Sequence, residues 1–417
     1  MIKTPTPLRI AYYTINDPLD KRSWSGITYY LGQSLKKSFG NVHFLGPVEI
    51  PWLIDKVFKG LQKCSRALFK TEWIPKYSML KNMYAARVLK NKMKGHQYDI
   101  LVAPAAASEL AYLNSDIPIV YYGDATYKIY SETYNKEFLN LNPFSRWEGD
   151  HLEKKALDKS SIVIFSSQWA AQSAVTDYGI PAEKVEVIQM GANIDTVPDY
   201  DTIFLKENSD VLTLLFLSVD WDRKGGPIAY DTMLNLHKRG IKVNLIVCGC
   251  IPPPQFSHTC MAVIPFLNKN ELGDLKCFTQ ILSSAHFLLL PTRADCTPIV
   301  NCEAGSYGMP VITTDVGGVS EAVKDGINGY CLPLQADGDE YAELIAKLFS
   351  DKENYHQLIV SSRRIFDDEL NWDKFAENFS KTLQKAFKKK NWFNNLTTHY
   401  MQTSLFKIGD KTLNSRL

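Results

Sequence analysis

The stretch HFLLLPTRADCTPIVNCEA, residues 286–304, combines a strand, a turn and the start of a helix. The short apolar run at its beginning is typical of a buried strand, and Pro-Thr ends that run. We predict a helix that begins near Thr297 or Pro298, because proline is favoured at the first helical position. Asp295 before this helix and Glu303 inside it are eight residues apart. Two carboxylates there would accept hydroxyl groups, and the helix N-terminus would attract an anion.

Similar apolar runs lie on both sides of this stretch and alternate with helix-length segments, which predicts parallel sheets with crossover helices. The first series comprises 8–13, 42–45, 100–103, 117–121, 162–165 and 185–189, and the second comprises 212–219, 243–247, 261–266, 287–290, 311–313 and 329–332. A polar, irregular segment separates them. We therefore predict an α/β protein with two domains, 1–195 and 196–377. Two alternatives stay open for the tail 378–417, which either packs back on the first domain or is loose.

Length and composition agree with two ordinary globular domains. The chain has 417 residues, of which 45% are hydrophobic and 22% are charged. The formal net charge of +2 gives no reason to expect nucleic acid as a partner. The eight cysteines lack the paired spacing of a zinc site. No signal peptide and no apolar window of about 18 residues is found, so we expect a cytoplasmic protein.

A second turn with charged residues follows the strand 212–219 and reads DWDRKGG, residues 220–226. Arg223 and Lys224 at the end of a buried strand suit a diphosphate, and the two glycines after them would let a ligand approach the backbone. The next helix is expected to begin near Ile228. The alternative is a solvated loop. Asp-Trp-Asp also matches a D-x-D metal motif, but so short a match is frequent by chance, and we expect no metal.

A third turn, TDVGGVSE at 314–321, again places glycines before a predicted helix. Because the carboxyl ends of parallel strands lie at one edge of a sheet, the three turns are expected to meet there. The alternative for Asp295 and Glu303 is a capping residue and a solvated helix residue. Three such turns at one edge favour a binding site over that alternative.

The region 216–332 resembles the retaining glycosyltransferases of sequence family 4, which have the GT-B fold of two Rossmann-like domains facing each other across a cleft. The resemblance rests on the Lys-Gly pair, the two acids with seven residues between them, and the Val-Gly-Gly turn. It implies that Lys224 binds the donor diphosphate, that Asp295 contacts the transferred sugar, and that Glu303 contacts the ribose. It also implies that the backbone of three consecutive residues lies near the phosphate or the sugar: Thr297, Pro298 and Ile299.

The sequence departs from the family pattern at three places. Ser-Val at 218–219 replaces the Gly-Arg of many members, so Arg223 is assigned as a displaced substitute for the family's arginine. Asp295 replaces a glutamate and reaches one methylene less far, which makes it the position where the donor sugar is expected to differ. Cys-Thr-Pro at 296–298 replaces the usual Pro-Phe-Gly.

The first domain and one further loop supply the remaining candidates. Gly26 lies in a turn ahead of the helix expected at 29–37, and the resemblance implies that this loop approaches the donor. Packing is the alternative explanation for this glycine. Asp124 would either orient the acceptor hydroxyl or cap the next turn. Base recognition is expected from the backbone around Phe266 and Leu267.

The segment 51–96 is strongly basic. It carries eleven Lys or Arg against two acids, a local charge of +9, interleaved with apolar residues at helical spacing. One interpretation is an amphipathic helix at an anionic membrane surface. The other is an ordinary helical insertion whose apolar side packs on the sheet.

These features together predict a glycosyltransferase. It would transfer a hexosyl group from a UDP-, GDP- or ADP-sugar to an acceptor hydroxyl on a glycan or lipid-linked molecule, with retention of anomeric configuration as in the resembling family. It would need no cofactor or metal and would work in the cytoplasm, with possible contact to the inner face of the membrane through 51–96. The alternatives are a catalytically silent nucleotide-sugar-binding protein, or an epimerase or phosphorylase on the same fold.

Overall fold

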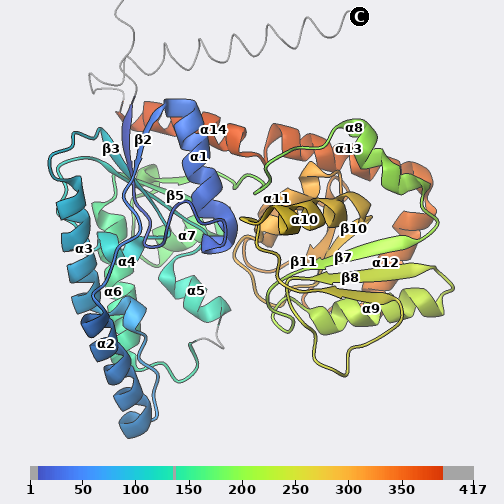
Figure 1. Ribbon diagram of the computed structural model, residues 1–417, viewed down its shortest axis with the longest axis horizontal. Helices are drawn as coiled ribbons and strands as arrows, with labels where there is room; N and C mark the ends of the chain where they lie inside the picture. The colour runs from blue at the N-terminus through green and yellow to red at the C-terminus, as the bar shows by residue number, and fades with distance from the viewer. Residues whose placement is uncertain (1–7, 135–137, 388–417) are drawn as a thin grey trace, which may run out of the picture.

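The computed structural model describes residues 8–134 and 138–387, which form two α/β domains (Figure 1). Each domain has a six-stranded sheet in which every strand pairing is parallel. The first sheet has the order β2-β1-β3-β4-β5-β6 and the second the order β12-β11-β10-β7-β8-β9. The prediction of two Rossmann-like domains facing each other is therefore confirmed.

The twelve strands coincide with the twelve predicted runs to within a few residues at either end. Those of the first sheet are β1 Arg9–Tyr12, β2 Asn41–Phe44, β3 Ile100–Pro104, β4 Ile119–Gly123, β5 Ile162–Phe165 and β6 Val185–Val187. Those of the second are β7 Leu212–Leu217, β8 Val243–Cys248, β9 Met261–Ile264, β10 Phe287–Leu290, β11 Val311–Thr314 and β12 Gly329–Leu332. Strands β3, β4, β5, β10 and β11 are buried along their whole length, as expected for sheets covered on both faces.

Helices cover both faces of each sheet. The first domain contains α1 Ile27–Phe39, α2 Trp52–Cys64, α3 Met79–Met93, α4 Ala107–Leu110, α5 Tyr127–Thr133, α6 Pro143–Lys159 and α7 Gln168–Thr176. The following segments are α8 Tyr200–Phe204, α9 Gly226–Lys238, α10 Leu272–Ser284, α11 Ile299–Ser306, α12 Gly338–Ser350, α13 Lys352–Asp368 and α14 Trp372–Phe387.

Three of the predicted helix starts need correction. Pro298 has ψ 113°, an extended value, so it is the N-cap residue and α11 begins at Ile299. The helix after the Arg-Lys turn, α9, begins at Gly226 rather than near Ile228. The third turn leads only into a short 3₁₀ helix, Val319–Glu321.

The chain crosses between the domains twice, and the two crossings are hydrogen-bonded to each other. The backbone N–H of Ala192 donates to the carbonyl oxygen of Leu370 at 3.0 Å. The Trp372 indole N–H donates to the Asn193 side-chain oxygen, also at 3.0 Å. These contacts join the two connecting segments to each other.

The last described helix, α14, packs on the first domain beside α1 (Figure 1). Ser34 of α1 donates a hydrogen bond to the Trp372 carbonyl oxygen at 2.7 Å, and the rings of Phe39 and Phe379 pack edge to face. Residues from 372 onward therefore belong to the first domain by packing, although the sequence analysis counts 372–377 with the second. The part of the tail beyond 387 lies outside the described residues.

Candidate active site between the two domains

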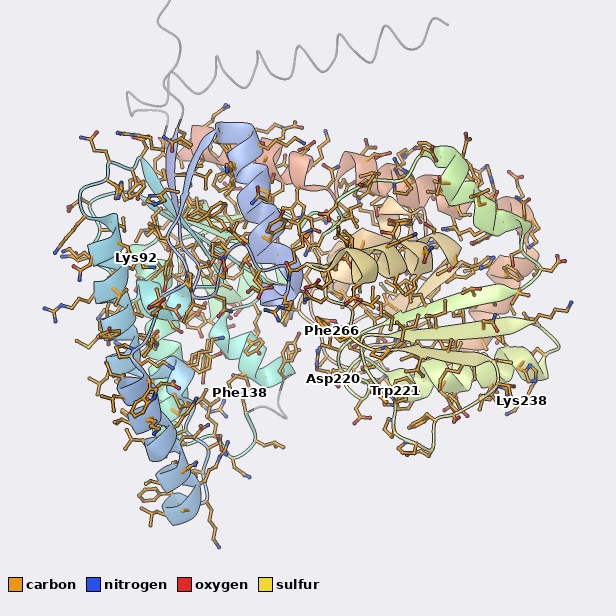
Figure 2. The ribbon with its side chains drawn as sticks, in the orientation of Figure 1. Lys92, Phe138, Asp220, Trp221, Lys238 and Phe266 are labelled. Atoms are coloured by element: carbon orange, nitrogen blue, oxygen red, sulfur yellow. The ribbon has the colours of Figure 1, made fainter. Side chains whose placement is uncertain are left out.

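A cavity of about 470 Å³ lies between the domains, at the carboxyl ends of both sets of strands. All site residues predicted from the sequence line it except Gly26: Asp124, Arg223, Lys224, Phe266, Leu267, Asp295, Thr297, Pro298, Ile299 and Glu303. Figure 2 shows Phe266 and Asp220 on the side of the second domain that faces the first. Strand-to-helix turns thus bring these residues together, as is usual for ligand sites in open α/β sheets.

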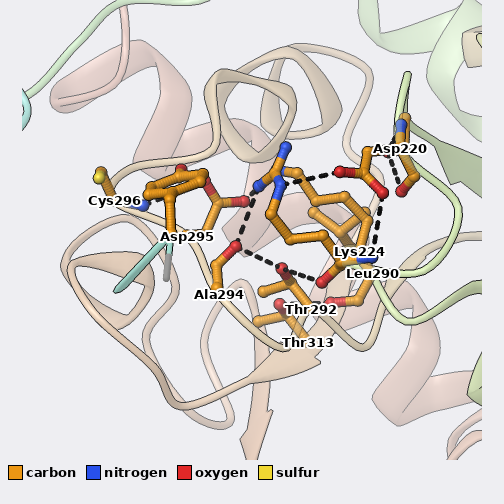
Figure 3. A network of polar contacts seen from close by, with 11 residues as sticks. Asp220, Lys224, Leu290, Thr292, Ala294, Asp295, Cys296 and Thr313 are labelled. Carbon is orange, nitrogen blue, oxygen red and sulfur yellow. Dashed lines mark hydrogen bonds and ion pairs between the residues drawn. The ribbon is translucent and has the colours of Figure 1, made fainter. Parts of the chain in front are cut away.

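Lys224 and Asp295 form an ion pair inside this cavity (Figure 3). Their side chains are 13% and 7% exposed. Asp295 also accepts hydrogen bonds from the Tyr134 hydroxyl at 3.2 Å and from the Cys296 backbone N–H at 3.1 Å. The carboxylate predicted to contact the sugar is therefore held by partners from both domains.

Arg223 is fixed next to this pair by three contacts. Its Nε lies 3.2 Å from Asp220 Oδ2, its Nη1 donates to the Ala294 carbonyl oxygen at 3.0 Å, and its guanidinium lies 4.8 Å from the centre of the Tyr134 ring. Burial works to lower the pKa of Arg223, but Tyr134, Asp295 and Asp220 outweigh it and the pKa is raised. The guanidinium is thus cationic and preorganised at the cavity wall.

Asp220 is hydrogen-bonded within its own turn. Its Oδ1 accepts the Arg223 backbone N–H at 3.1 Å, while Trp221 beside it is buried in the core of the second domain. Among the described residues there is no group of three or more His, Cys, Asp or Glu side chains placed to hold a metal ion.

Glu303 lies on α11 at the other end of the site, with its side chain 2% exposed. Its Oε1 is 2.8 Å from Nζ of Lys269, which also donates to the Asn193 carbonyl oxygen at 3.3 Å. Burial raises the pKa of Glu303, and Lys269 opposes that rise. A buried carboxylate with one neighbouring cation has acceptor capacity left for ligand hydroxyls.

The glycines after Lys224 do not line the cavity, which corrects the expectation that they admit a ligand. A Cβ on Gly225 would lie 1.9 Å from the Pro291 carbonyl oxygen, and one on Gly226 would lie 2.1 Å from the Trp221 ring. Both glycines therefore allow the turn to pack against its own domain. Gly26 is buried and likewise does not line the cavity.

The two domains touch at several points around the cavity. The hydroxyls of Ser166 and Thr297 are 2.8 Å apart, and the Gln168 backbone N–H donates to Glu321 at 2.8 Å. On the opposite side the Asn270 amide donates to Asp20 at 2.9 Å. The structure therefore shows the domains in contact around the site.

Asp124 enters the cavity from the end of β4 in the first domain. Burial raises its pKa to about 6; hydrogen bonds from its own backbone N–H and the Trp24 side chain work in the opposite direction, and the charge of Asp295 adds to the rise. The next helix, α5, has Thr126 as its N-cap residue. Asp124 therefore lines the ligand cavity and is not the N-cap residue of α5.

The sequence analysis missed several residues that line the same cavity. They are Lys21, Trp24, Tyr130, Tyr134 and Lys269. Lys269 could have been found, because it follows the loop at 265–268 where base recognition was expected. The others come from the segment 21–24 and from α5 with the residue that follows it, and neither carries a recognisable motif.

The basic segment forms α2, a π-helical turn Ser65–Phe69, and α3. The apolar side of α2 does not pack on the sheet, because Phe58 is its one buried residue. Trp52 is 62% exposed and Leu68 is 74% exposed. The interpretation of an ordinary packed insertion therefore does not hold for α2, but it holds for α3, which buries Ala85, Ala86 and Leu89 in the core of the first domain. Within 8–134 and 138–387 no helix is long and apolar enough to cross a bilayer.

Two family models match adjacent parts of the chain. "Glycosyltransferase Family 4" matches residues 55–196, and "Glycosyl transferases group 1" matches residues 204–365. Each model corresponds to one of the two domains. The chain therefore belongs to the family-4 glycosyltransferases with the GT-B fold, and it is a transferase that acts on nucleotide sugars.

Individual relatives are distant. Alpha-maltose-1-phosphate synthase of Mycolicibacterium smegmatis is 24% identical over 284 residues, which cover 59% of this chain and 71% of that protein. Spore coat protein SA of Bacillus subtilis is 35% identical, but only over 86 residues, 21% of this chain and 23% of that protein. The match to the second protein is confined to a local segment.

Solved structures share the fold. Sucrose-phosphate synthase from Thermosynechococcus elongatus superposes with a TM-score of 0.64 at 16% identity, covering 92% of this chain and 100% of that one. HepE from Anabaena, solved in complex with UDP and glucose, has a TM-score of 0.58 at 17% identity, covering 90% of this chain and 99% of that one. At such identities the likeness concerns the fold.

Proposed function

We propose that this protein transfers a hexosyl group from a nucleoside diphosphate sugar to an acceptor hydroxyl, with retention of anomeric configuration. The observation that carries the proposal is an interdomain cavity lined by the cations Arg223 and Lys224 and by the carboxylates Asp295 and Glu303. The cations suit a diphosphate, and the carboxylates suit the hydroxyls of a sugar and a ribose. HepE, which shares the fold, has been solved with UDP and glucose.

The geometry supports a mechanism based on stabilisation of the leaving group. As the glycosidic bond breaks, negative charge builds up on the diphosphate, and Arg223 and Lys224 lie where they would stabilise it more in the transition state than in the ground state. The acceptor hydroxyl would attack the face that the diphosphate leaves, and a phosphate oxygen would take its proton. Domain contacts around the cavity would exclude water and limit donor hydrolysis.

The double substitution of Arg223 and Lys224 by alanine tests this proposal. Release of nucleoside diphosphate from UDP-, GDP- and ADP-sugars, with an acceptor extract present, should fall at least a hundredfold. Arg239→Ala is the matched control, because Arg239 forms a surface ion pair with Asp339 on the same domain and should change nothing. Full activity in the double variant would remove the diphosphate assignment.

The same assay separates the competing functions. A silent nucleotide-sugar-binding protein would show a thermal shift with one nucleotide and no donor consumption. An epimerase would convert the donor without an acceptor, and a phosphorylase would require inorganic phosphate. Acceptor-dependent release of the nucleotide distinguishes a transferase from all three.

We also propose that Arg223 and Lys224, rather than a divalent metal, neutralise the diphosphate. Both are cations in the cavity itself, and Arg223 is held in place by Asp220. Turnover should therefore be unchanged by EDTA. Loss of turnover in EDTA that Mg²⁺ restores would contradict this assignment.

A further part of the proposal is that α2 contacts an anionic membrane surface. At about 100° per residue, Leu53, Val57 and Leu61 lie on one arc of the helix. All three are at least half exposed. The adjoining arc carries three exposed cations: Lys56, Lys59 and Lys63. An apolar stripe beside a cationic stripe suits the boundary between acyl chains and anionic headgroups.

Vesicle sedimentation tests this contact. The protein should bind vesicles of phosphatidylcholine with phosphatidylglycerol more than tenfold better than vesicles of phosphatidylcholine alone. Replacing Leu53, Val57 and Leu61 by glutamine should abolish binding. Glutamine at Ile251 and Leu272, which lie on the second domain and are more exposed than the three tested residues, provides the control. Equal binding to both kinds of vesicle would exclude this role.

A further inference from the structure

A second cavity, of about 270 Å³, lies in the first domain next to the donor cavity. Its walls come from the ends of β1, β3 and β4, from α6 and from the short helix Pro75–Tyr77. It shares Trp24, Asp124 and Tyr130 with the donor cavity. The two cavities are therefore neighbours, and Asp124 stands at their junction.

Two residues that line this second cavity each carry a buried polar atom without a hydrogen-bond partner in the described part of the chain. The atoms are Oε1 of Glu153 on α6 and the hydroxyl of Tyr127 on α5. The two residues are only 7% and 4% exposed. Buried polar groups in proteins are nearly always paired, so two unpaired groups on one cavity wall indicate a missing hydrogen-bonding ligand.

The charges around the cavity restrict what that ligand can be. Asp124 and Glu153 line the cavity, and the buried Glu109 follows Ser108 of its wall. Lys76 is the lining cation, and it lies exposed at the rim. Among its described lining residues, the cavity therefore offers no buried cation that could pair with a phosphate or a carboxylate.

The ionisation of Glu153 fits an uncharged ligand. Burial raises its pKa to about 8, the charge of Asp150 adds to the rise, and Lys76 and the Tyr127 backbone N–H oppose it. Near neutral pH this carboxyl is mainly protonated, so it can both donate and accept hydrogen bonds. The rings of Trp24, Tyr77 and Tyr127 add apolar wall to the same space.

We propose that this cavity is the acceptor subsite and that it takes an uncharged, hydroxyl-rich sugar residue, with Glu153 and Tyr127 as the residues that select it. The sugar's hydroxyls would pair with the two unpartnered groups and its hydrocarbon face would lie on the aromatic rings. Asp124 at the junction would contact the hydroxyl that receives the hexosyl group. This assignment rests on the proposed transferase function, because it names the acceptor of that reaction.

Saturation-transfer NMR tests the assignment with methyl glycosides of glucose, galactose and mannose as probes, with and without UDP. At least one should bind, and Glu153→Gln and Tyr127→Phe should each weaken its affinity about tenfold. Tyr112→Phe is the control, because the Tyr112 hydroxyl is also buried and unpaired but lies outside the cavity. The UDP affinity and the melting temperature of each variant show whether the fold is intact. If Tyr127→Phe does not fold, the glycoside affinity of Glu153→Gln is sufficient to test the assignment.

Two results would overturn the assignment. One is unchanged glycoside affinity in both folded variants. The other is a preference for hexose 6-phosphates or for methyl glucosaminide over the neutral glycosides. Failure of the proposed function looks different, because acceptor-dependent release of the nucleotide would then be absent, while glycoside binding could still be measured without UDP.

Discussion

Replacing Glu303 by glutamine gives a direct test of how the donor nucleotide is held. Glu303 is buried, and its carboxylate contacts Nζ of Lys269 at 2.8 Å. If this carboxylate accepts both hydroxyls of the ribose, glutamine keeps one acceptor oxygen and replaces the other by a donor. The variant should therefore lose about one charge-assisted hydrogen bond to the nucleotide.

The magnitude follows from the value of such a bond. A hydrogen bond to a charged group contributes about 1.5–3 kcal/mol. A loss of about 2 kcal/mol corresponds to roughly a 30-fold weaker affinity, since 1.4 kcal/mol is tenfold. Lys269 also loses its partner in the variant, but it keeps the Asn193 carbonyl oxygen at 3.3 Å. That local cost must be separated from the effect on the ribose.

Calorimetry with UDP and 2′-deoxy-UDP makes the separation. The wild type should bind the deoxynucleotide more weakly than UDP, and Glu303→Gln should bind both with similar, reduced affinity, which is the pattern of a double-mutant cycle with coupling. Glu343→Gln on the exposed face of α12 should behave like the wild type. Equal loss of both nucleotides in Glu303→Gln would show that the carboxylate supports the fold of the site and does not bind the ribose. If UDP does not bind, GDP or ADP is compared with its 2′-deoxy form in the same way.

Two further predictions concern stability. Gly317 has φ +58°, and a Cβ there would lie 2.0 Å from the Asp295 carbonyl oxygen, whereas Gly240 has φ +80° and no neighbour within 4 Å. Gly240→Ala should lower the free energy of unfolding in urea by about 1 kcal/mol, because only the backbone conformation is strained. Gly317→Ala should lower it by about 2–4 kcal/mol, because the new Cβ also clashes with Asp295. Equal losses in the two variants would contradict the close packing at Gly317. Burial raises the pKa of Glu153 from 4.5 to about 8, so the folded chain keeps a proton that the unfolded chain releases, and stability falls as pH rises through this range. The melting temperature of Glu153→Gln should therefore exceed that of the wild type by more at pH 8.5 than at pH 5.5, and a constant difference would refute the shift.

The fold could be predicted because its signal is local. Each strand is a short apolar run between turn residues, and the alternation with helices defines parallel sheets. The starts of helices were less accurate, as at Pro298. Proline is compatible with both the N-cap and the first helical position, and the choice is made by the backbone that precedes it.

The charged residues of the site could be predicted because strand order fixes where turns meet. Arg223, Lys224, Asp295 and Glu303 lie in turns that follow strands or in the helices after them, so one edge of the sheet gathers them. Tyr134 reaches Asp295 from a loop 161 residues away and no local pattern marks it. Contacts across a domain boundary are tertiary and leave no periodic trace in the sequence.

The role of the glycines in these turns could not be predicted from the sequence either. Gly225 approaches the Pro291 carbonyl oxygen, and Gly317 approaches that of Asp295. A glycine that admits a ligand and one that admits a neighbouring strand or turn look identical in the sequence. Only the packing of the second domain shows that these glycines bring the Arg-Lys turn and the Asp295 turn close to their neighbours.

The two ion pairs in the site mean that a donor meets each carboxylate already paired with a lysine. Lys224 is paired with Asp295 and Lys269 with Glu303, so each acid is neutralised by a lysine. A diphosphate that draws Lys224 to itself frees the Asp295 carboxylate, which the Tyr134 hydroxyl and the Cys296 N–H still hold in position. Under the proposed function, binding of the phosphates to Lys224 therefore also makes the Asp295 carboxylate available to the sugar. A nucleoside diphosphate sugar would be recognised at both ends together, whereas a free sugar would have to displace Lys224 without supplying a replacement anion.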